Sequence, residues 1–392
     1  MANHLQNPDS AAGHVLDRLR EVAKTVPQFA ASVAVDGRSV CEVNPDLELC
    51  ACSTTKVAAA TAVLSLVQEG RVDLDAVAMD VDPRLTFRDV ARGGRITIRM
   101  LLSHTSGLSD TDRPEEDPLG CLPSLRHVAD PGRVFCYSNV GFVCGVIAAA
   151  RQVDQTYQSL IEQRVIKPLE MTSTRWRAEL GFNSFVTTTR DLTRLAYEQL
   201  GGGKVLASET LAEMRRVHGD SYAAGAARYY GLGLVIEDWD GLELYSHGGG
   251  LNNFGSAFLL DGGARASVAM MFDHPAGYAM SAHQCLDELL GRATSSPART
   301  PLPVDWREWL GRYANGAELL DVDGKPHLTY AGIRNLALEL FDENVLVTSK
   351  PVRIPTLAPS PISVGLVPGE PRMIVLNHFP PIGARPGRRL ES

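Results

Sequence analysis

A serine and a lysine lie three positions apart, as Ser53 and Lys56, in the run LCACSTTKVAAATAVLSLVQ (residues 49–68). Positions i and i+3 share one face of a helix, so the hydroxyl and the amine can meet. Lys56 is the only charged side chain of this run, which predicts that the segment is buried. A buried ammonium is costly unless it is paired or loses its proton. A lysine in this state can act as a base beside a serine nucleophile.

The Ser53 and Lys56 spacing occurs once among the six lysines of the chain. The alternative interpretation is a serine at a helix start, followed by a lysine whose stem is buried and whose amine reaches the surface. A four-residue motif cannot separate the two, because short motifs match by chance.

A second candidate group is Tyr137 and Asn139, in the segment PGRVFCYSNVGF, where a Pro-Gly turn leads into an apolar helix. Two residues apart in an extended or capping segment, their side chains point the same way. A phenol near an ammonium is drawn toward phenolate, which suits proton transfer to and from a serine. The alternative is a helix N-cap at Ser138 or Asn139, preceded by a tyrosine that only packs.

A third candidate group is His247 with the glycines that follow it, directly after the strand-like segment LELYS. Glycines allow a substrate backbone to approach closely and leave N–H groups free to donate to an oxyanion. His247 adds a titratable side chain at the strand end. The alternative is a flexible hairpin turn.

The elements that must position these residues follow from the sequence pattern. Residues from Asp9 or Ser10 predict an amphipathic helix, and FAASVAVDGRSVCEVN predicts two strands joined by an Asp36-Gly37 turn. The helix that carries Ser53 should end near Gly70. Helical patterns dominate residues 73–214, and strands return in YGLGLVIEDW, LELYSHG, FGSAFLL and RASVAMMF. We therefore expect one antiparallel sheet shared by early and late segments, with helices covering it and a helical subdomain at one end.

The last part of the chain has a different pattern. A helix through Cys285 to Leu290 closes the first unit, and residues 293–303 form a Pro- and Ser-rich linker. Residues 304–313 predict a short helix, and the rest predicts brief strands in HLTYAG, LALELFD, NVLVTS and RMIVLNHF. A small β-rich domain is expected from residue 304 onward.

Composition excludes several classes of function. The 392 residues are 44% hydrophobic and 21% charged, with a net charge of −8, which is typical of a soluble globular protein and gives no footprint for nucleic acid. No run reaches the ~20 apolar residues of a membrane span, and the first residues lack a signal peptide, so we expect no membrane partner and a cytoplasmic location. Seven cysteines without a CxxC pair and ten histidines without HExxH predict no disulfide framework, no metal and no cofactor.

In this order, S-x-x-K, Y-x-N and H-x-G resemble the serine β-lactamase and penicillin-binding protein superfamily, in its branch of class C β-lactamases, D-stereospecific peptidases and esterases. The resemblance covers roughly residues 10–292 and is supported by RITIRMLLSHTSGL, KPLEMTSTRW and TTTRDLTRLA. It implies an α/β (α+β) fold of the β-lactamase/transpeptidase type. The domains would be a catalytic domain over 1–292, a linker over 293–303, and over 304–392 a C-terminal β domain that resembles lipocalin-like appendages of some relatives.

The resemblance also implies roles. Ser53 would be the nucleophile that forms an acyl-enzyme, Lys56 would activate it, and Tyr137 would be the base for acylation and then the acid for the leaving group. Asn139 would bind substrate, and His247 would take a place that a lysine usually holds.

The resemblance further implies that Gly249 and Gly250 line the substrate site. The backbone N–H groups of Ser53 and Gly250 would form the oxyanion hole. His104, at a turn after an apolar helix, is expected to be structural, with its imidazole bonded to loop backbone.

Two departures from the family pattern affect the expected substrate. His247-Gly248-Gly249 replaces the K-T-G that helps true β-lactamases of this type to hold a carboxylate, and no export signal is seen. Both favour an intracellular serine hydrolase or acyltransferase acting on a small-molecule ester or amide, such as a transacylase of natural-product (antibiotic) biosynthesis with an amine acceptor. A true β-lactamase, a D-peptidase or a non-catalytic binding protein with the same fold are the alternatives.

Overall fold

The structure is a computed structural model, and it describes residues 8–26, 28–109, 117–177, 184–239, 241–251, 254–273, 281–292, 305–342, 344–352, 362–370, 372–377 and 385–390. Its main sheet is antiparallel and runs in the order β2-β1-β11-β10-β9-β8-β7-β6. The strands are β1 (Phe29–Val35), β2 (Arg38–Val43), β6 (Gly219–Asp220), β7 (Ala227–Tyr230), β8 (Val235–Trp239), β9 (Leu242–Leu251), β10 (Phe254–Asp261) and β11 (Ala266–Phe272). The early strand β1 lies between β2 and β11, which confirms that early and late segments share one sheet.

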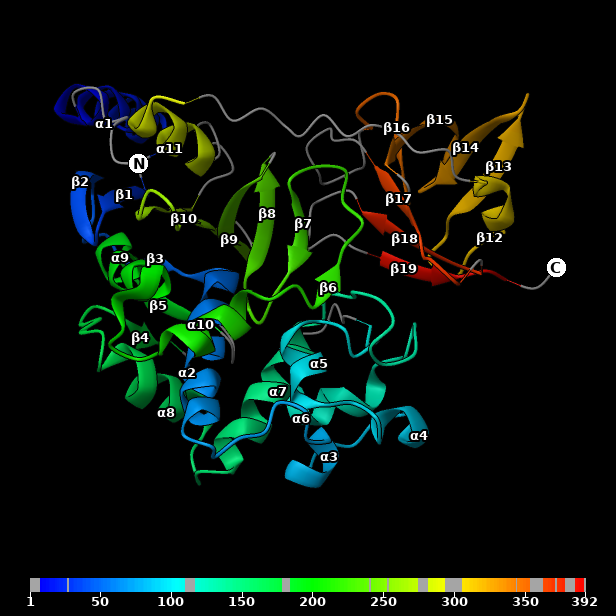
Figure 1. Ribbon diagram of the computed structural model, residues 1–392, viewed down its shortest axis with the longest axis horizontal. Helices are drawn as coiled ribbons and strands as arrows, with labels where there is room; N and C mark the ends of the chain where they lie inside the picture. The colour runs from blue at the N-terminus through cyan, green and yellow to red at the C-terminus, as the bar shows by residue number, and fades with distance from the viewer. Residues whose placement is uncertain are drawn as a thin grey trace.

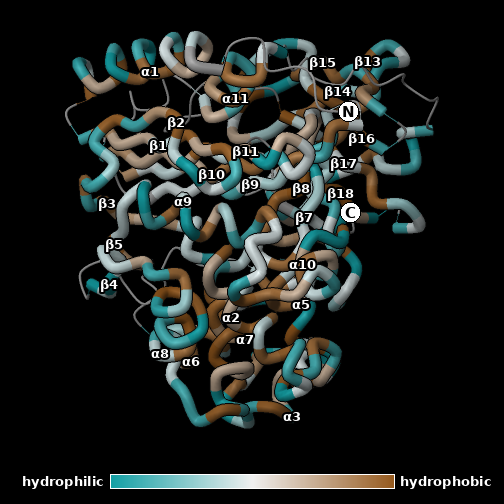
Figure 2. Tube along the Cα trace, turned by 60° about the vertical axis from the view of Figure 1, so that its left-hand side comes forward, coloured by the Kyte–Doolittle hydropathy of each residue, from teal (hydrophilic) through white to brown (hydrophobic). Residues whose placement is uncertain are grey.

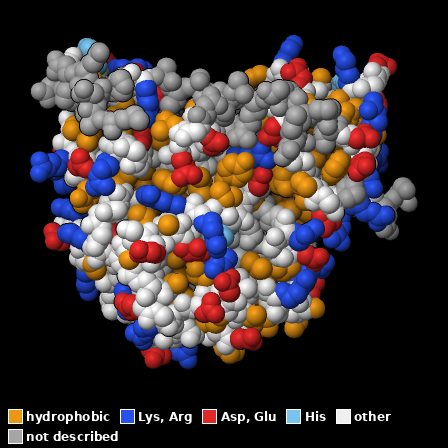
Figure 3. All heavy atoms as spheres, viewed as in Figure 1, with side chains coloured by type: hydrophobic (Ala, Val, Ile, Leu, Met, Phe, Trp, Pro, Cys, Tyr) orange, Lys and Arg blue, Asp and Glu red, His pale blue; other side chains and the backbone are white. Residues whose placement is uncertain are grey.

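Helices cover both faces of this sheet (Figure 1). On one face lie α1 (Pro8–Thr25) and α11 (Ala282–Leu290), which share an apolar core with β1 and β11. On the other face lies the helical lobe, whose centre is formed by the apolar helices α2 (Thr55–Gln68) and α7 (Asn139–Arg151), brown in Figure 2. Figure 3 shows hydrophobic side chains gathered along the middle of the face viewed in Figure 1, at the boundary between sheet and lobe.

The remaining elements of the helical lobe are short. The helices are α3 (Ala78–Val81), α4 (Val90–Gly93), α5 (Ile98–Leu102), α6 (Pro118–Cys121), η2 (Leu122–Ser124), α8 (Tyr157–Ile161), η3 (Glu162–Ile166), α9 (Thr189–Tyr197), η5 (Glu198–Gly202) and α10 (Ser208–Arg215). A small sheet beside them joins β3 (Leu49–Cys50), β5 (Phe185–Thr187) and β4 (Arg175–Trp176). Among the helices described, none is long and apolar enough to cross a bilayer.

The C-terminal part forms a second antiparallel sheet, a half-barrel in which each strand pairs with its neighbour in sequence. A 3₁₀ turn, η7 (Trp306–Trp309), precedes it. The strands are β12 (Gly311–Arg312), β13 (Glu318–Val322), β14 (Lys325–Tyr330), β15 (Ile333–Asp342), β16 (Val345–Thr348), β17 (Ser363–Leu366), β18 (Met373–Asn377) and β19 (Arg385–Arg388). The expected small β domain is confirmed, and the expected linker over 293–303 lies outside the described residues.

Two local expectations are confirmed by backbone geometry. The turn between β1 and β2 places Asp36 at φ 49° and Gly37 at φ 72°, the left-handed pair that matches the twist of a two-residue hairpin. The helix after Ser53 ends at Gln68, with Gly70 at φ 68°.

Two other expectations are wrong in extent. The strand expected from Tyr230 to Trp239 is two strands, because Gly231 and Gly233 turn the chain between them, with Gly231 N–H donating to Leu234 O at 2.8 Å and Gly233 at φ 75°. The helix expected over 304–313 is one 3₁₀ turn, because the chain after it pairs as β12 with β13.

Candidate active site

Ser53 lies at a sharp turn between β3 and α2. The Ala51 N–H donates to Phe185 O at 2.9 Å, and Ala51 O accepts the Ser256 hydroxyl at 2.7 Å, so this backbone is tied to β5 and to β10. Cys52 has φ 50°, a left-handed conformation uncommon for a side chain of this size. The turn then enters η1 (Cys52–Thr54), which leads directly into α2, so Ser53 is presented at the start of the helix and remains partly exposed.

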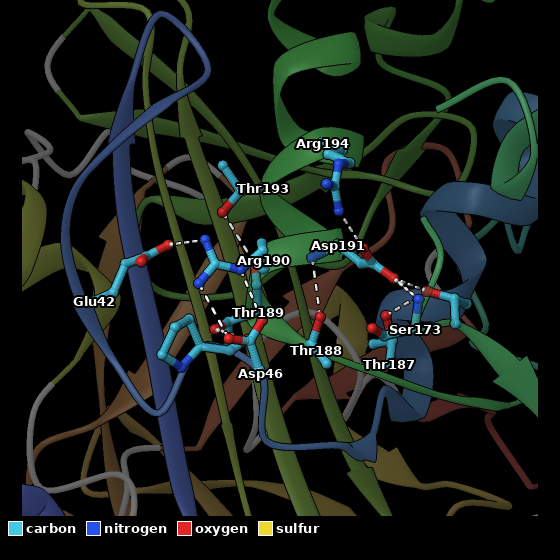
Figure 4. Close-up of polar contacts among 12 residues, drawn as sticks. Glu42, Asp46, Ser173, Thr187, Thr188, Thr189, Arg190, Asp191, Thr193 and Arg194 are labelled. Carbon is cyan, nitrogen blue, oxygen red and sulfur yellow. Dashed lines mark hydrogen bonds and ion pairs between the residues drawn. The ribbon is translucent and has the colours of Figure 1, made fainter. Parts of the chain in front are cut away.

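A buried polar network holds β5, the partner strand of β3 (Figure 4). Asp191 accepts hydrogen bonds from Ser173 N–H at 2.8 Å and from the Thr174 hydroxyl at 2.9 Å, and Thr174 also bonds Thr187 of β5 at 2.7 Å. Thr188 caps α9 by accepting from Asp191 N–H at 3.2 Å. The network therefore fixes the strand on which the Ser53 turn rests.

The Lys56 amine lies beside Ser53, as the i, i+3 spacing predicts. The residue is 2% exposed, and its Nζ donates to Asn139 Oδ1 at 2.7 Å and to Ser53 Oγ at 3.4 Å. The surface-reaching alternative is therefore wrong for Lys56. Its charge is held inside the protein by two side-chain oxygens.

Tyr137 and Asn139 both face Lys56. Ser138 caps α7 by accepting from Gly141 N–H at 3.2 Å, so the N-cap interpretation is correct for this residue. The residues on either side of it point to the same place, since Lys56 Nζ lies 5.2 Å from the Tyr137 ring centre. The Tyr137 hydroxyl is buried and has no hydrogen-bond partner among the described residues.

His104 packs against the back of Tyr137. Their ring centres are 4.1 Å apart, and His104 Nδ1 accepts from Ser138 N–H at 3.1 Å. Burial, together with the positive charge of Lys56, lowers the pKa of His104 well below its usual value. A neutral imidazole bonded to loop backbone is the structural role expected for this residue.

His247 on β9 is completely buried, and the protein occupies both of its ring nitrogens. Its Nδ1 lies 2.6 Å from Gly248 O, which can only accept, so Nδ1 carries the proton and Nε2 accepts from the Tyr230 hydroxyl at 3.0 Å. Burial and the charge of Lys56 lower the pKa of His247 to about 3. His247 is therefore neutral at pH 7. Sequence reasoning gave no signal for Tyr230, because its partnership arises from the pairing of distant strands.

The glycines after His247 bring β9 against the Ser53 turn. A Cβ built on Gly249 would lie 2.8 Å from Ser53 N and 2.7 Å from Cys52 Cβ, so only glycine fits there. At Gly248 the nearest atom to such a Cβ is 4.0 Å away. The backbone of Gly249 thus runs beside the Ser53 N–H, with Gly250 as the next residue of β9.

The model of the Beta-lactamase family matches residues 16–284, more than half of the chain. The chain belongs to the beta-lactamase family. Its serine-hydrolase fold, with the lysine of the S-x-x-K motif beside the serine, agrees with this membership.

Individual relatives in the beta-lactamase family cover most of the chain. Penicillin-binding protein 4 of Amycolatopsis lactamdurans is 26% identical over 353 residues, 75% of this chain and 90% of that protein. D-aminopeptidase of Brucella anthropi is 22% identical over 403 residues, 79% of this chain and 73% of that protein. The crystal structure of SurE with D-Leu superposes with a TM-score of 0.72 at 21% identity, covering 97% of this chain and all of that one.

In this beta-lactamase family member, the thiol of Cys50 is buried and has two polar neighbours. Its Sγ lies 3.6 Å from Cys52 Sγ and 3.2 Å from the Ser184 hydroxyl. Donation from Cys52 outweighs burial and, with Ser184, lowers the pKa of Cys50 to about 6. The signal in the sequence was C-x-C directly before the nucleophile. All seven cysteines are free of disulfides.

The C-terminal sheet packs directly against the segment that carries Tyr137. A buried apolar cluster joins residues of both parts, namely Ala129, Val134, Phe135, Tyr137, Tyr222, Tyr230, Val235, Val345, Val367, Met373 and Val375. The C-terminal domain of this beta-lactamase family member therefore supports one side of the site.

Proposed function

We propose that this protein is a serine acyl-enzyme hydrolase or acyltransferase of the class C β-lactamase type, acting on a small-molecule ester or amide. The observation that carries the proposal is the buried Lys56 amine, 3.4 Å from Ser53 Oγ and 2.7 Å from Asn139 Oδ1. It lies beside Tyr137, whose hydroxyl has no hydrogen-bond partner in the part of the chain that the structure describes. A buried cation between a serine and a tyrosine is an arrangement for activating the serine.

In the proposed acylation, Tyr137 acts as a phenolate, and its oxygen accepts the proton of Ser53 Oγ as that oxygen attacks the substrate carbonyl carbon. The charge of Lys56 stabilises the negative charge that develops on the attacking oxygen. The N–H groups of Ser53 and Gly250 donate to the carbonyl oxygen as it becomes an oxyanion. Tyr137 then protonates the leaving group as its bond to the carbonyl carbon breaks.

In the proposed deacylation, water or an amine attacks the same carbon. The Tyr137 phenolate accepts the proton of the attacking group, and it returns that proton to Ser53 Oγ as the bond from Oγ to the carbonyl carbon breaks. Transfer is favoured over hydrolysis where an amine is bound and water is excluded. We propose transfer to an amine, of the kind used in natural-product biosynthesis, as the alternative to hydrolysis.

The state of His247 supports a substrate without a carboxylate at that position. A neutral imidazole whose nitrogens are both bonded to protein offers no cation and no free donor. A lysine at this point would provide both. We therefore propose that His247 positions Tyr230 and the β9 backbone, and that β-lactam hydrolysis is a minor activity or absent.

The names of two similar proteins support a preference for D-configured substrates. One is named a D-aminopeptidase, and the other was solved with D-Leu. We propose that the acyl donor or its leaving group carries a D-configured centre. Hydrolysis of D- and L-leucine p-nitroanilide, measured in parallel, tests this, and equal rates would refute the preference.

Covalent labelling of Ser53 tests the acyl-enzyme. After incubation with a fluorophosphonate, intact-protein mass spectrometry should show one adduct, and peptide mapping should place it on Ser53. Ser53→Ala should give none, and Lys56→Met should label about 10²–10⁴-fold more slowly. A folded parent protein that forms no adduct would refute the enzyme proposal and favour a binding protein of the same fold.

Partitioning between acceptors separates hydrolase from transferase. With an activated ester as donor, product ratios are measured with and without added amines. A transferase yields amide in proportion to the amine. Product that is always the free acid would exclude the transferase.

A further inference from the structure

A cavity lies between the helical lobe and the C-terminal sheet, and Ser53 does not line it. Its volume is about 440 Å³, within the range of cavities that hold small molecules. The helical lobe contributes Arg92, Arg126, His127 and Cys136 to its wall, and the C-terminal sheet contributes Asn315 and Arg388. It is thus built from segments far apart in sequence, on the side where β19 approaches the lobe in Figure 1.

The charge of this cavity is opposite to that of the whole protein. Three arginines line it, and none of the described lining residues is acidic, whereas the chain carries a net charge of −8. Arg126 and Arg388 are exposed. A cluster of cations kept on an acidic protein is suited to binding an anion.

Arg92 is fixed at the cavity by its own ion pairs. It donates from Nε to Asp130 and from Nη1 to Asp89, each at 2.7 Å. Hydrogen bonding to Arg92, with the charges of Arg92, Arg95 and Arg388, holds the pKa of Asp130 below its usual value, so Arg388 of the C-terminal sheet lies within electrostatic reach of the helical lobe. About two positive charges are therefore unmatched there, because four arginines face two aspartates, namely Arg92, Arg95, Arg126 and Arg388 against Asp89 and Asp130.

His127 provides an independent sign that this cavity binds a polar ligand. Both of its ring nitrogens are buried, and neither has a hydrogen-bond partner among the described residues. Buried polar atoms usually have partners, so an orphaned imidazole in a cavity wall needs an explanation. An anion in the cavity would accept from it.

We propose that this cavity binds a small molecule with a head group of about two negative charges, a phosphate monoester or a dicarboxylate, attached to an apolar body. Arg126 and Arg388 bond the head group from opposite walls, and Val128, Ala129 and Pro386 contact the body. The ligand therefore bridges the helical lobe and the C-terminal sheet.

The proposed site also reaches the back of the Tyr137 segment. Cys136 lines the cavity and precedes Tyr137, and Ser109, another wall residue, accepts the Ser138 hydroxyl at its carbonyl oxygen at 3.2 Å. Binding in the cavity is thus positioned to affect the segment that carries Tyr137, without a contact to Ser53. This inference does not depend on the function proposed above.

Calorimetry tests the site with two probes, phenyl phosphate and phthalate, at low salt. Either probe should bind with one site per chain, and the tighter one identifies the head group. Arg126→Ala and Arg388→Ala should each weaken binding at least tenfold, since a charge-assisted bond is lost. Arg334→Ala, an exposed arginine on β15 that does not line the cavity, should leave binding unchanged. Ser53→Ala should also bind normally, which separates this test from that of the enzyme.

Thiol labelling gives a second, local readout. Cys136 and Cys144 lie in one tryptic peptide, residues 134–151, and only Cys136 lines the cavity. Bound probe should slow maleimide labelling of Cys136 and leave Cys144 unchanged. Absence of saturable binding, binding that both arginine variants retain, or no protection of Cys136 would overturn the proposal.

Discussion

At the scale of single residues, Asn139 holds the Lys56 amine more closely than Ser53 does. The Nζ is 2.7 Å from Asn139 Oδ1 and 3.4 Å from Ser53 Oγ. Asn139 was expected only to bind substrate. The geometry gives it an additional part, since it orients the amine that is proposed to activate Ser53.

Replacement of Asn139 by alanine should therefore slow acylation itself. Loss of a hydrogen bond to a charged group costs about 1.5–3 kcal/mol, which corresponds to about 10- to 100-fold in the rate of fluorophosphonate labelling. The labelling rate is independent of how a natural substrate binds. Asn335→Ala, at an exposed position of the C-terminal sheet, is the control. An unchanged labelling rate in Asn139→Ala would restrict Asn139 to substrate binding.

The buried His247 should make the protein sensitive to acid. In the unfolded chain histidine binds a proton near pH 6.5, but in the folded protein the pKa is about 3. The unfolded state therefore binds more protons between these values, and the free energy of unfolding falls as the pH decreases, by about 1.4 kcal/mol per pH unit. From pH 6.5 to pH 5 this amounts to about 2 kcal/mol.

Urea denaturation at pH 7, 6 and 5 measures this effect. His247→Gln can donate to Gly248 O and accept from Tyr230, but it does not titrate. Its free energy of unfolding should fall less steeply with acid than that of the parent, by about one proton. Equal slopes would show that His247 is protonated in the folded state at these pH values.

The residues whose positions follow from local geometry could be predicted. The i, i+3 spacing brought Ser53 and Lys56 together, and the two-residue spacing placed Tyr137 and Asn139 on one side. The protonation state of His247 could not be predicted, because it depends on burial and on the bond to the Tyr230 hydroxyl. Tyr230 lies on β7, which comes near β9 only through the pairing of both strands with β8. The contact of Cys50 with Cys52, which lowers the pKa of Cys50, could not be predicted either, because it depends on the fold of the turn.

At the scale of elements, the approach of β9 to η1 should tolerate no side chain at Gly249. In Gly249→Ala the new methyl would lie 2.8 Å from Ser53 N and 2.4 Å from Ser256 Oγ, so the Ser53 turn must shift. We expect fluorophosphonate labelling to fall at least 100-fold, since a small displacement of catalytic groups has effects of this size. Gly248→Ala, with its nearest atom 4.0 Å away, is the adjacent control. Equal labelling of both variants would mean that the contact is adaptable.

The network at the start of α9 should contribute to both stability and activity. Asp191→Ala leaves Ser173 N–H and the Thr174 hydroxyl without their buried acceptor, which should lower the free energy of unfolding by about 3 kcal/mol. Because the network holds β5, Ser53 labelling should slow as well. The control is Asp17→Ala on α1, whose side chain is 76% exposed and whose effect should stay within about 0.5 kcal/mol. Matching effects in the two aspartate variants would exclude a special role for the network.

The elements whose signals are local could be predicted, such as the hairpin at Asp36-Gly37 and the helix α2. The sequence around Trp306 and Trp309 has a helical pattern, but pairing of β12 with β13 ends the helix after one turn. The segment YGLGLVIEDW predicts one strand, but its glycines turn the chain between β7 and β8. In both places, strand pairing and turn geometry outweighed the local propensity of the sequence.

At the scale of the whole molecule, two ion pairs among the described residues connect the first part of the chain to the C-terminal sheet, and they should differ in strength. Arg228 is buried, pairs with Asp220 at 2.7 Å and also contacts Asp342 of β15. Arg133 and Glu370, 2.9 Å apart, have side chains that are 54% and 36% exposed. Removal of one member of a buried pair costs about 3–5 kcal/mol, whereas an exposed pair contributes about 0–1 kcal/mol.

Arg228→Met should therefore lower the urea midpoint strongly, and Arg133→Met only slightly. Tryptophan fluorescence follows the transition in both parts, through Trp176 and Trp239 in one and Trp306 and Trp309 in the other. Weakened packing of the sheet against the Tyr137 segment should also slow Ser53 labelling in Arg228→Met. Similar midpoints for the two variants would show that this buried arginine adds little to the docking of the C-terminal sheet.

The contacts of the Ser53 turn with distant strands also determine when the proposed active site can form during synthesis. The ribosome adds Ser53 early, but the turn is anchored by Ser256 of β10 and closed by Gly249 of β9, and the sheet is complete only with β11. Contacts this distant in sequence form after the later segment has emerged. A nascent chain that ends before β9 carries the serine and its lysine, but it lacks the strand edge that would stabilise an oxyanion. If Ser53 acts as proposed, the fold thus delays its reactivity until β9, β10 and β11 have been translated.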